Sequence, residues 1–133
     1  MEIVTKSARE TQELGKKLAN NLKGGIVALY GELGSGKTTF VQGLAAGLGI
    51  KKRIVSPTFI FIRQYSNFYH IDLYRIEKPE DARGLGLEEI LGDPANIVVI
   101  EWAEKIKNLL PKKRIDVKFK ILGENERKIT TSY

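Results

Sequence analysis

The stretch GELGSGKT, residues 31–38, constrains the fold of this chain more than any other segment. It follows IVALY, residues 26–30, an unbroken apolar run typical of a strand that is buried on both faces. It precedes TTFVQGLAAGLGI, where apolar residues recur at helical spacing and Gly49 is a plausible end. Glycines allow the connecting turn backbone angles that other residues resist. A strand, a tight turn and a helix in this order predict a sheet flanked by helices.

The same stretch matches the pattern G-x-x-x-x-G-K-[ST] in full. In such a P-loop, successive backbone N–H groups and the positive end of the helix dipole face a phosphate. Lys37 would bring its charge to the β- and γ-phosphates, and the Thr38 hydroxyl can bind Mg²⁺. A glycine-rich turn with an incidental lysine is the alternative. We therefore expect ATP and Mg²⁺ as cofactors, with the nucleotide bound by Glu32, Leu33, Gly34, Ser35, Gly36, Lys37, Thr38 and Thr39.

The remaining elements follow from apolar periodicity and turn residues. Helices are predicted over 7–22, 79–91 and 103–110, and strands over 55–65, 67–74, 96–102, 114–122 and 127–133. Apolar strands that alternate with helices are typical of a mainly parallel α/β sheet, as in P-loop NTPases. The last two strands flank the turn 123–125 and are expected to form a C-terminal antiparallel hairpin. With 133 residues, the chain has room for one domain, spanning 1–133.

Two acidic residues end predicted strands and are the candidate catalytic residues. Glu101 closes NIVVIE and Asp72 closes NFYHID. One acid could bind the metal together with Thr38, while the other orients the attacking water. Glu101 is the closer match for the metal-binding acid. Each acid could instead cap a helix or pair with a lysine. His70 is expected to be packed rather than catalytic, and Trp102 is expected to fill the core rather than to cover the nucleotide.

Composition limits the kinds of site and the cellular location that we expect for this protein. The chain has no cysteine, which excludes disulfides and thiolate metal sites. It has no apolar run long enough for a membrane span, and its N-terminus lacks the apolar segment of a signal peptide, so we expect a cytoplasmic protein that is not bound to a membrane. The net charge is +6, with basic clusters at 51–53 and 112–114 that could contact RNA or could simply be solvated.

Several motifs together resemble one family. GELGSGKTTF, VSPTF, HIDLYR, GLGLEEIL and IEWAEKI occur in the order seen in the bacterial TsaE (YjeE) ATPases of tRNA N6-threonylcarbamoyladenosine (t6A) synthesis, over roughly residues 5–130. The resemblance implies that Thr58, in VSPTF, belongs to a switch element near the nucleotide, and that Asp72 and Glu101 both act near Mg²⁺. It also implies TsaD and TsaB as partners, ATP hydrolysis that resets their complex between turnovers, and contact with tRNA through that complex. Glu32 and Ser35 depart from the usual Asp and Ala at variable positions.

Three other functions are alternatives to this one. A small-molecule kinase is disfavoured because no arginine-rich lid is recognisable, and a GTPase because the chain has no N-K-x-D for reading guanine. A nucleotide-gated binding module, in which hydrolysis is not essential, stays open because binding and hydrolysis use the same loop.

Overall fold

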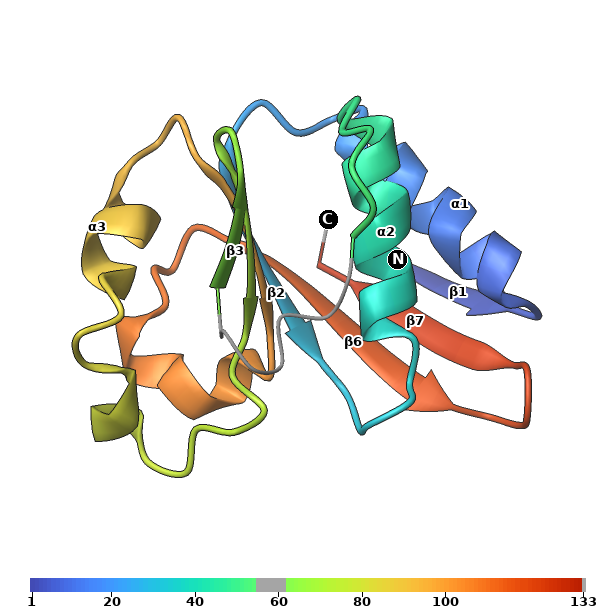
Figure 1. The fold of residues 1–133 in the computed structure, drawn as a ribbon. Coiled ribbons are helices and arrows are strands. Elements are labelled where there is room, and N and C mark those ends of the chain that lie inside the picture. Colours follow the sequence, from blue (N-terminus) through green and yellow to red (C-terminus); the bar gives the residue numbers. More distant parts are fainter. Residues whose placement is uncertain (55–61, 133) are drawn as a thin grey trace.

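The computed structural model describes residues 1–54 and 62–132, and within them the chain forms three layers, with helices on both faces of one sheet (Figure 1). The described part of the sheet has seven strands in the order β1-β7-β6-β2-β5-β4-β3. Their bounds are β1 Glu2–Thr5, β2 Gly25–Tyr30, β3 Ile62–Tyr65, β4 Phe68–Asp72, β5 Ile97–Glu101, β6 Ile115–Ile121 and β7 Arg127–Thr131. The helices are α1 Ala8–Ala19, α2 Lys37–Gly47 and α3 Leu87–Gly92, with 3-10 helices η1 Pro79–Ala82 and η2 Ala103–Leu109.

The sheet is mixed, and its parallel part is central. β6, β2, β5 and β4 run parallel to one another, whereas β3, β7 and β1 are joined to the sheet by antiparallel pairing. The predicted antiparallel hairpin at the C-terminal end is confirmed as the β6–β7 pair. The sequence predicted a mainly parallel sheet, but only half of the strand pairings are parallel. The other half are antiparallel and join the outer strands to the parallel centre. The carboxyl ends of the four parallel strands still meet at one edge, where ligands bind in open α/β sheets.

Two predicted helices need correction, one strand was not predicted, and one predicted strand is described only in part. The N-terminal strand β1 was not predicted, because its four residues gain their conformation by pairing with β7. The predicted helix 79–91 is divided into η1 and α3, since Gly84 and Gly86 between them have positive φ values. The predicted helix 103–110 is a 3-10 element with non-helical angles at Ile106. The predicted strand 55–65 begins at Ile62 in the described part, and residues 55–61 lie outside it.

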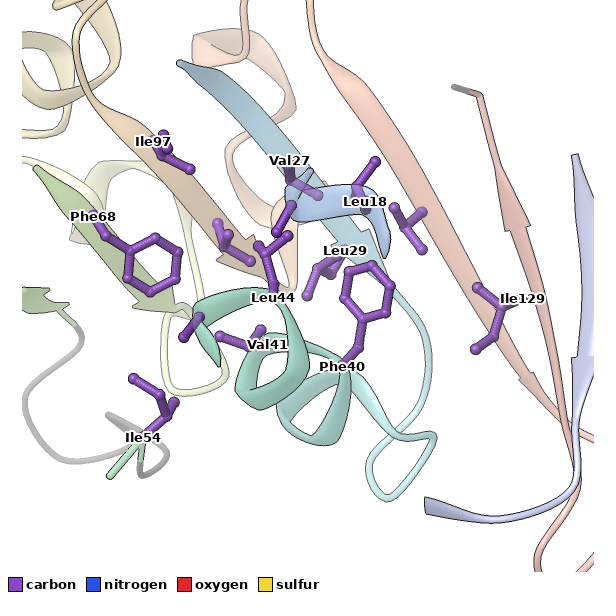
Figure 2. Packing of buried hydrophobic residues seen from close by; sticks show 14 of the residues in the cluster. Leu18, Val27, Leu29, Phe40, Val41, Leu44, Ile54, Phe68, Ile97 and Ile129 are labelled. Atoms are coloured by element: carbon purple, nitrogen blue, oxygen red, sulfur yellow. The ribbon is translucent and has the colours of Figure 1, made fainter. Parts of the chain in front are cut away.

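The core between α2 and the sheet fixes the position of the helix that begins at the glycine-rich turn. Phe40, Val41 and Leu44 on α2 are fully or almost fully buried. They face Val27 and Leu29 of β2, as Figure 2 shows. The opposite face of the sheet carries a second apolar cluster, which η1, α3 and η2 cover. Because β2 is covered on both sides, its end and the start of α2 are held firmly relative to each other.

Helices α1 and α2 pack closely through glycines. A methyl group placed on Gly43 of α2 would meet the backbone of Gln12 on α1, and one on Gly15 of α1 would meet the backbone of Phe40 and Leu44. Backbone-to-backbone contact of this kind requires residues without a side chain. No helix in the described ranges has the length and apolar composition that crossing a membrane requires.

Candidate functional site

The glycine-rich turn joins β2 to α2, as predicted, and α2 begins at Lys37. Gly36 is the residue before the helix and has a φ of 101°, and Gly34 has a φ of 78°. Both values lie in the left-handed region, where a side chain would be strained, so glycine is required at these two positions. The turn thereby brings its backbone around to the first turn of α2, whose free N–H groups point out of the helix.

A cavity of about 350 Å³ opens at this turn, at the carboxyl ends of the central strands. This volume is within the range of about 300–1,000 Å³ that is usual for small-molecule sites. All of the predicted site residues in the described part line it, with the exception of Glu32, whose backbone oxygen accepts a hydrogen bond from Lys37. Thr58, the remaining predicted site residue, lies outside the described residues.

The two candidate acids stand side by side at the ends of neighbouring parallel strands. Asp72 is the last residue of β4, Glu101 is the last residue of β5, and the two are paired in register. Their exposed fractions are 5% and 3%. The hydroxyl Oγ1 of Thr38 lies 3.2 Å from Oε1 and 3.1 Å from Oε2 of Glu101. The structure therefore brings together the two residues that were predicted to bind the metal, although they are 63 positions apart.

His70 is packed, as expected, and it also contacts the site, which sequence reasoning missed. Its side chain is fully buried, and its Nε2 lies 2.5 Å from Oε2 of Glu101. A signal for this contact was present in the chain, because His70 precedes Asp72 by two residues. Residues two apart on a strand project from the same face of the sheet. A histidine two residues before a functional acid on a strand therefore has its side chain on the same face of the sheet as that acid.

Lys37 is held at one side of the cavity by backbone carbonyls and an aromatic ring. Its Nζ donates hydrogen bonds to the carbonyl oxygens of Gly31 and Glu32 and lies 4.0 Å from the centroid of the Trp102 ring. Burial lowers the pKa of the Lys37 ammonium from its ordinary value, while carboxylates that include those of Glu101 and Asp72 act in the opposite direction. A partly buried cation with no carboxylate partner at hydrogen-bond distance among the described residues is well suited to attract an anion.

Trp102 packs against the core, as expected, and it also contacts the site. It borders the second apolar cluster, but its ring also lines the cavity and is in contact with Lys37. Its φ of 61° is in the left-handed region, which is uncommon for a bulky residue. Such outliers concentrate at functional sites, where the surrounding structure enforces them. The turn after β5 thus directs both Glu101 and Trp102 toward the glycine-rich turn.

Arg127, at the start of β7, is a further contact that sequence reasoning missed. Its guanidinium donates to the carbonyl oxygen of Gly34 at 3.1 Å and to that of Gly123, in the β6–β7 turn, at 2.8 Å. It lines the cavity, and its strand β7 lies across β2 from β4 and β5, which carry the acids. No sequence pattern marks this contact, because it depends on how the hairpin folds back toward the turn. The basic clusters at 51–53 and 112–114 do not line the cavity.

The donor atoms of the site fit Mg²⁺ and phosphate. Mg²⁺ prefers oxygen ligands and is usually held by one or two carboxylates together with substrate phosphates. A hydroxyl from Thr38 beside the Glu101 carboxylate supplies such a set, and the described residues contain no cluster of three or more His, Cys, Asp or Glu that would suit an all-protein cage. The hydroxyl of Ser35 is buried without a hydrogen-bond partner among the described residues, which leaves it available to a bound anion.

Comparison with known proteins places this site in a family. Residues 5–129 match the family model described as "Threonylcarbamoyl adenosine biosynthesis protein TsaE". The tRNA threonylcarbamoyladenosine biosynthesis protein TsaE of Treponema pallidum is 37% identical over 136 residues, covering 99% of this chain and 100% of the relative. That of Bacillus subtilis is 39% identical, covering 95% and 81%. The crystal structure of Bacillus subtilis YdiB superposes with a TM-score of 0.81 at 37% identity, covering 98% of this chain and 83% of that one. The chain belongs to the TsaE family, which takes part in tRNA threonylcarbamoyladenosine biosynthesis.

Proposed function

We propose that this protein is a Mg²⁺-dependent ATPase whose hydrolysis drives turnover of a TsaD–TsaB complex during t6A formation. The observation that carries the proposal is the contact of the Thr38 hydroxyl with the Glu101 carboxylate, inside the cavity that the glycine-rich turn forms. A phosphate-binding turn alone is shared by many proteins. A buried acid brought to the first residues of the following helix is the additional feature that metal-assisted phosphoryl transfer needs.

Nucleotide binding would use the turn and the start of α2. Residues 33–39 line the cavity, the first N–H groups of α2 have no acceptor within the helix, and the dipole of α2 favours negative charge at this end. Lys37 would exchange its carbonyl partners, Gly31 and Glu32, for phosphate oxygens. Because those carbonyls are neutral and phosphate is charged, the exchange strengthens the hydrogen bonds of the ammonium group. Lys37 would also leave the Trp102 ring, so binding and a local change at Trp102 are coupled.

Hydrolysis would use the two acids in different roles. Glu101 contacts Thr38, which favours these two residues as the holders of Mg²⁺. The ion, when bound, supplies charge neutralisation on the phosphate oxygens. Asp72 stands at the same level on the neighbouring strand and accepts a backbone hydrogen bond from Tyr74 at 2.9 Å. That bond would hold its carboxylate in place while it orients a water molecule toward the phosphate.

Reconstitution with the proposed partners tests this function. This protein and ATP are added to a purified TsaD–TsaB complex that forms t6A, and the number of t6A molecules per complex is counted. ATP should permit many turnovers, whereas a non-hydrolysable analogue, or the Lys37→Ala variant with ATP, should permit about one. Equal multiple turnover with the analogue would contradict an essential ATPase and would support the nucleotide-gated binding module instead.

A further inference from the structure

His70 is two residues before Asp72 on β4, and its side chain is on the same face of the sheet as those of Asp72 and Glu101. The sheet register pairs His70 with Val99, and Asp72 with Glu101. His70 and Glu101 are therefore diagonal neighbours on one face of two parallel strands. Long side chains can bridge this diagonal. The Nε2 atom of His70 does so, lying 2.5 Å from Oε2 of Glu101 in a region from which solvent is excluded.

Within the described residues, the carboxylate of Glu101 has two hydrogen-bond partners, Thr38 and His70, which restrain it in different ways. The Thr38 hydroxyl is almost equally distant from the two carboxylate oxygens, at 3.2 and 3.1 Å. It therefore does little to select the rotation of the carboxylate plane. His70 contacts one oxygen, Oε2, at a shorter distance. A donor on one oxygen makes the two carboxylate oxygens unequal and restrains the rotation of the group, so His70 is the partner that can set how Glu101 faces the cavity.

We propose that His70 is a positioning residue that holds Glu101 in the orientation needed to bind Mg²⁺ beside Thr38. This inference rests on the proposed function of the site. The Nε2–H group of His70 donates to Oε2 of Glu101, which leaves Oε1, 3.2 Å from the Thr38 hydroxyl, as the oxygen that would bind Mg²⁺. Partners that orient a metal ligand typically change metal affinity about 10–100-fold when they are removed. His70 thus acts through Glu101 and does not itself contact the nucleotide.

A packing role for His70 makes a different prediction from a positioning role. The other ring nitrogen, Nδ1, is buried without a hydrogen-bond partner among the described residues, so Nε2 is the ring atom through which a polar role acts. If His70 only filled space, an apolar residue of similar size would restore function. If it positions Glu101, function requires a donor at the place of Nε2. Glutamine can present its side-chain nitrogen there, whereas the shorter asparagine cannot.

The test measures metal binding directly, with Mn²⁺ as the spectroscopic probe for the Mg²⁺ site. Mn²⁺ is titrated into the full chain saturated with a non-hydrolysable ATP analogue, for wild type, His70→Gln, His70→Asn and His70→Leu. Tyr69→Phe is the matched control, because Tyr69 is adjacent on β4 but belongs to the opposite face of the sheet. We expect His70→Gln and the control to stay within about threefold of wild type, and the other two variants to lose about tenfold or more. Nucleotide affinity measured in EDTA should be unchanged in all of them.

The outcomes separate this inference from the proposed function. Wild-type Mn²⁺ affinity in His70→Leu, or equal affinities in His70→Gln and His70→Asn, would overturn the positioning role while the ATPase proposal stands. Loss of nucleotide affinity in EDTA in parallel with metal affinity would assign His70 to packing and would also overturn it. Failure of wild type to bind the analogue or Mn²⁺ would overturn both. If His70→Leu does not fold, the comparison of the glutamine and asparagine variants decides alone.

Discussion

Replacing Gly43 with alanine should disturb the nucleotide site through helix packing alone. Gly43 lies on α2 where this helix touches α1, away from the cavity lining. A methyl group at this position would stand 2.6 Å from the carbonyl carbon and 2.7 Å from the Cα of Gln12, and closer still to its carbonyl oxygen. All three are backbone atoms, so no side-chain rotation can relieve the overlap. The two helices would have to separate.

The size of the effect follows from these distances. Ordinary van der Waals contact begins at 3.4 Å, so the helices must move apart by at least about 0.8 Å at this point. Overpacking a core typically costs about 1–3 kcal/mol, and this contact belongs at the upper end because both sides are backbone. Alanine gains back about 1 kcal/mol in a helix relative to glycine. We expect a net loss of about 2 kcal/mol in the free energy of unfolding.

Chemical denaturation and ATP titration measure the two consequences. Stability should fall by the stated amount, and ATP affinity should also fall, because both helices contribute to the lining of the cavity, with Thr11 on α1 and Thr38 on α2. Gly92→Ala is the matched control, since a methyl group there meets nothing within 4 Å at the end of α3. It should leave stability unchanged or slightly raised. A Gly43→Ala protein within about 0.5 kcal/mol of wild type would refute the packing argument.

Three further predictions follow from single contacts. Phe40→Ala should cost about 3–5 kcal/mol of unfolding free energy by denaturation, because its ring is 1% exposed and packs edge-on against Phe119; a loss below 1 kcal/mol would contradict this. The emission of Trp102, the single tryptophan, should change when ATP is titrated in, since Lys37 leaves its ring; an unchanged spectrum at saturation would count against that exchange. Asp72→Asn should lower the hydrolysis rate, measured by phosphate release, at least about 100-fold. Its ATP affinity, measured by calorimetry, should stay within about threefold of the wild-type value. Wild-type turnover would show that Asp72 is not a catalytic residue.

Local patterns were enough to predict the parts of the site that are close in sequence. The turn between β2 and α2 follows from glycine placement and an apolar strand, and both acids were identified because each ends a strand. The meeting of Thr38 with Glu101 could also be anticipated, because the carboxyl ends of parallel strands share one edge of the sheet. These contacts follow from rules that act within about ten residues or from general sheet topology.

Contacts set by register and by loop geometry could not be predicted in the same way. His70 meets Glu101 because β4 pairs with β5 in one particular register, and a shift by one residue would turn the imidazole to the other face. Arg127 meets Gly34 because the β6–β7 hairpin bends toward the turn. The edge strand β1 exists because β7 provides a partner. In each case tertiary pairing, rather than local preference, determines the position.

Calorimetric titration of ATP into wild type and Lys37→Ala, in the presence of Mg²⁺, tests most directly whether the glycine-rich turn binds the nucleotide. We expect one ATP bound per wild-type chain and a loss of measurable binding in Lys37→Ala, because the variant lacks the cation that lines the cavity at the glycine-rich turn. Lys105→Ala is the control, since Lys105 also lies near Trp102 but does not line the cavity. ATP affinity equal to wild type in Lys37→Ala would contradict nucleotide binding at this turn.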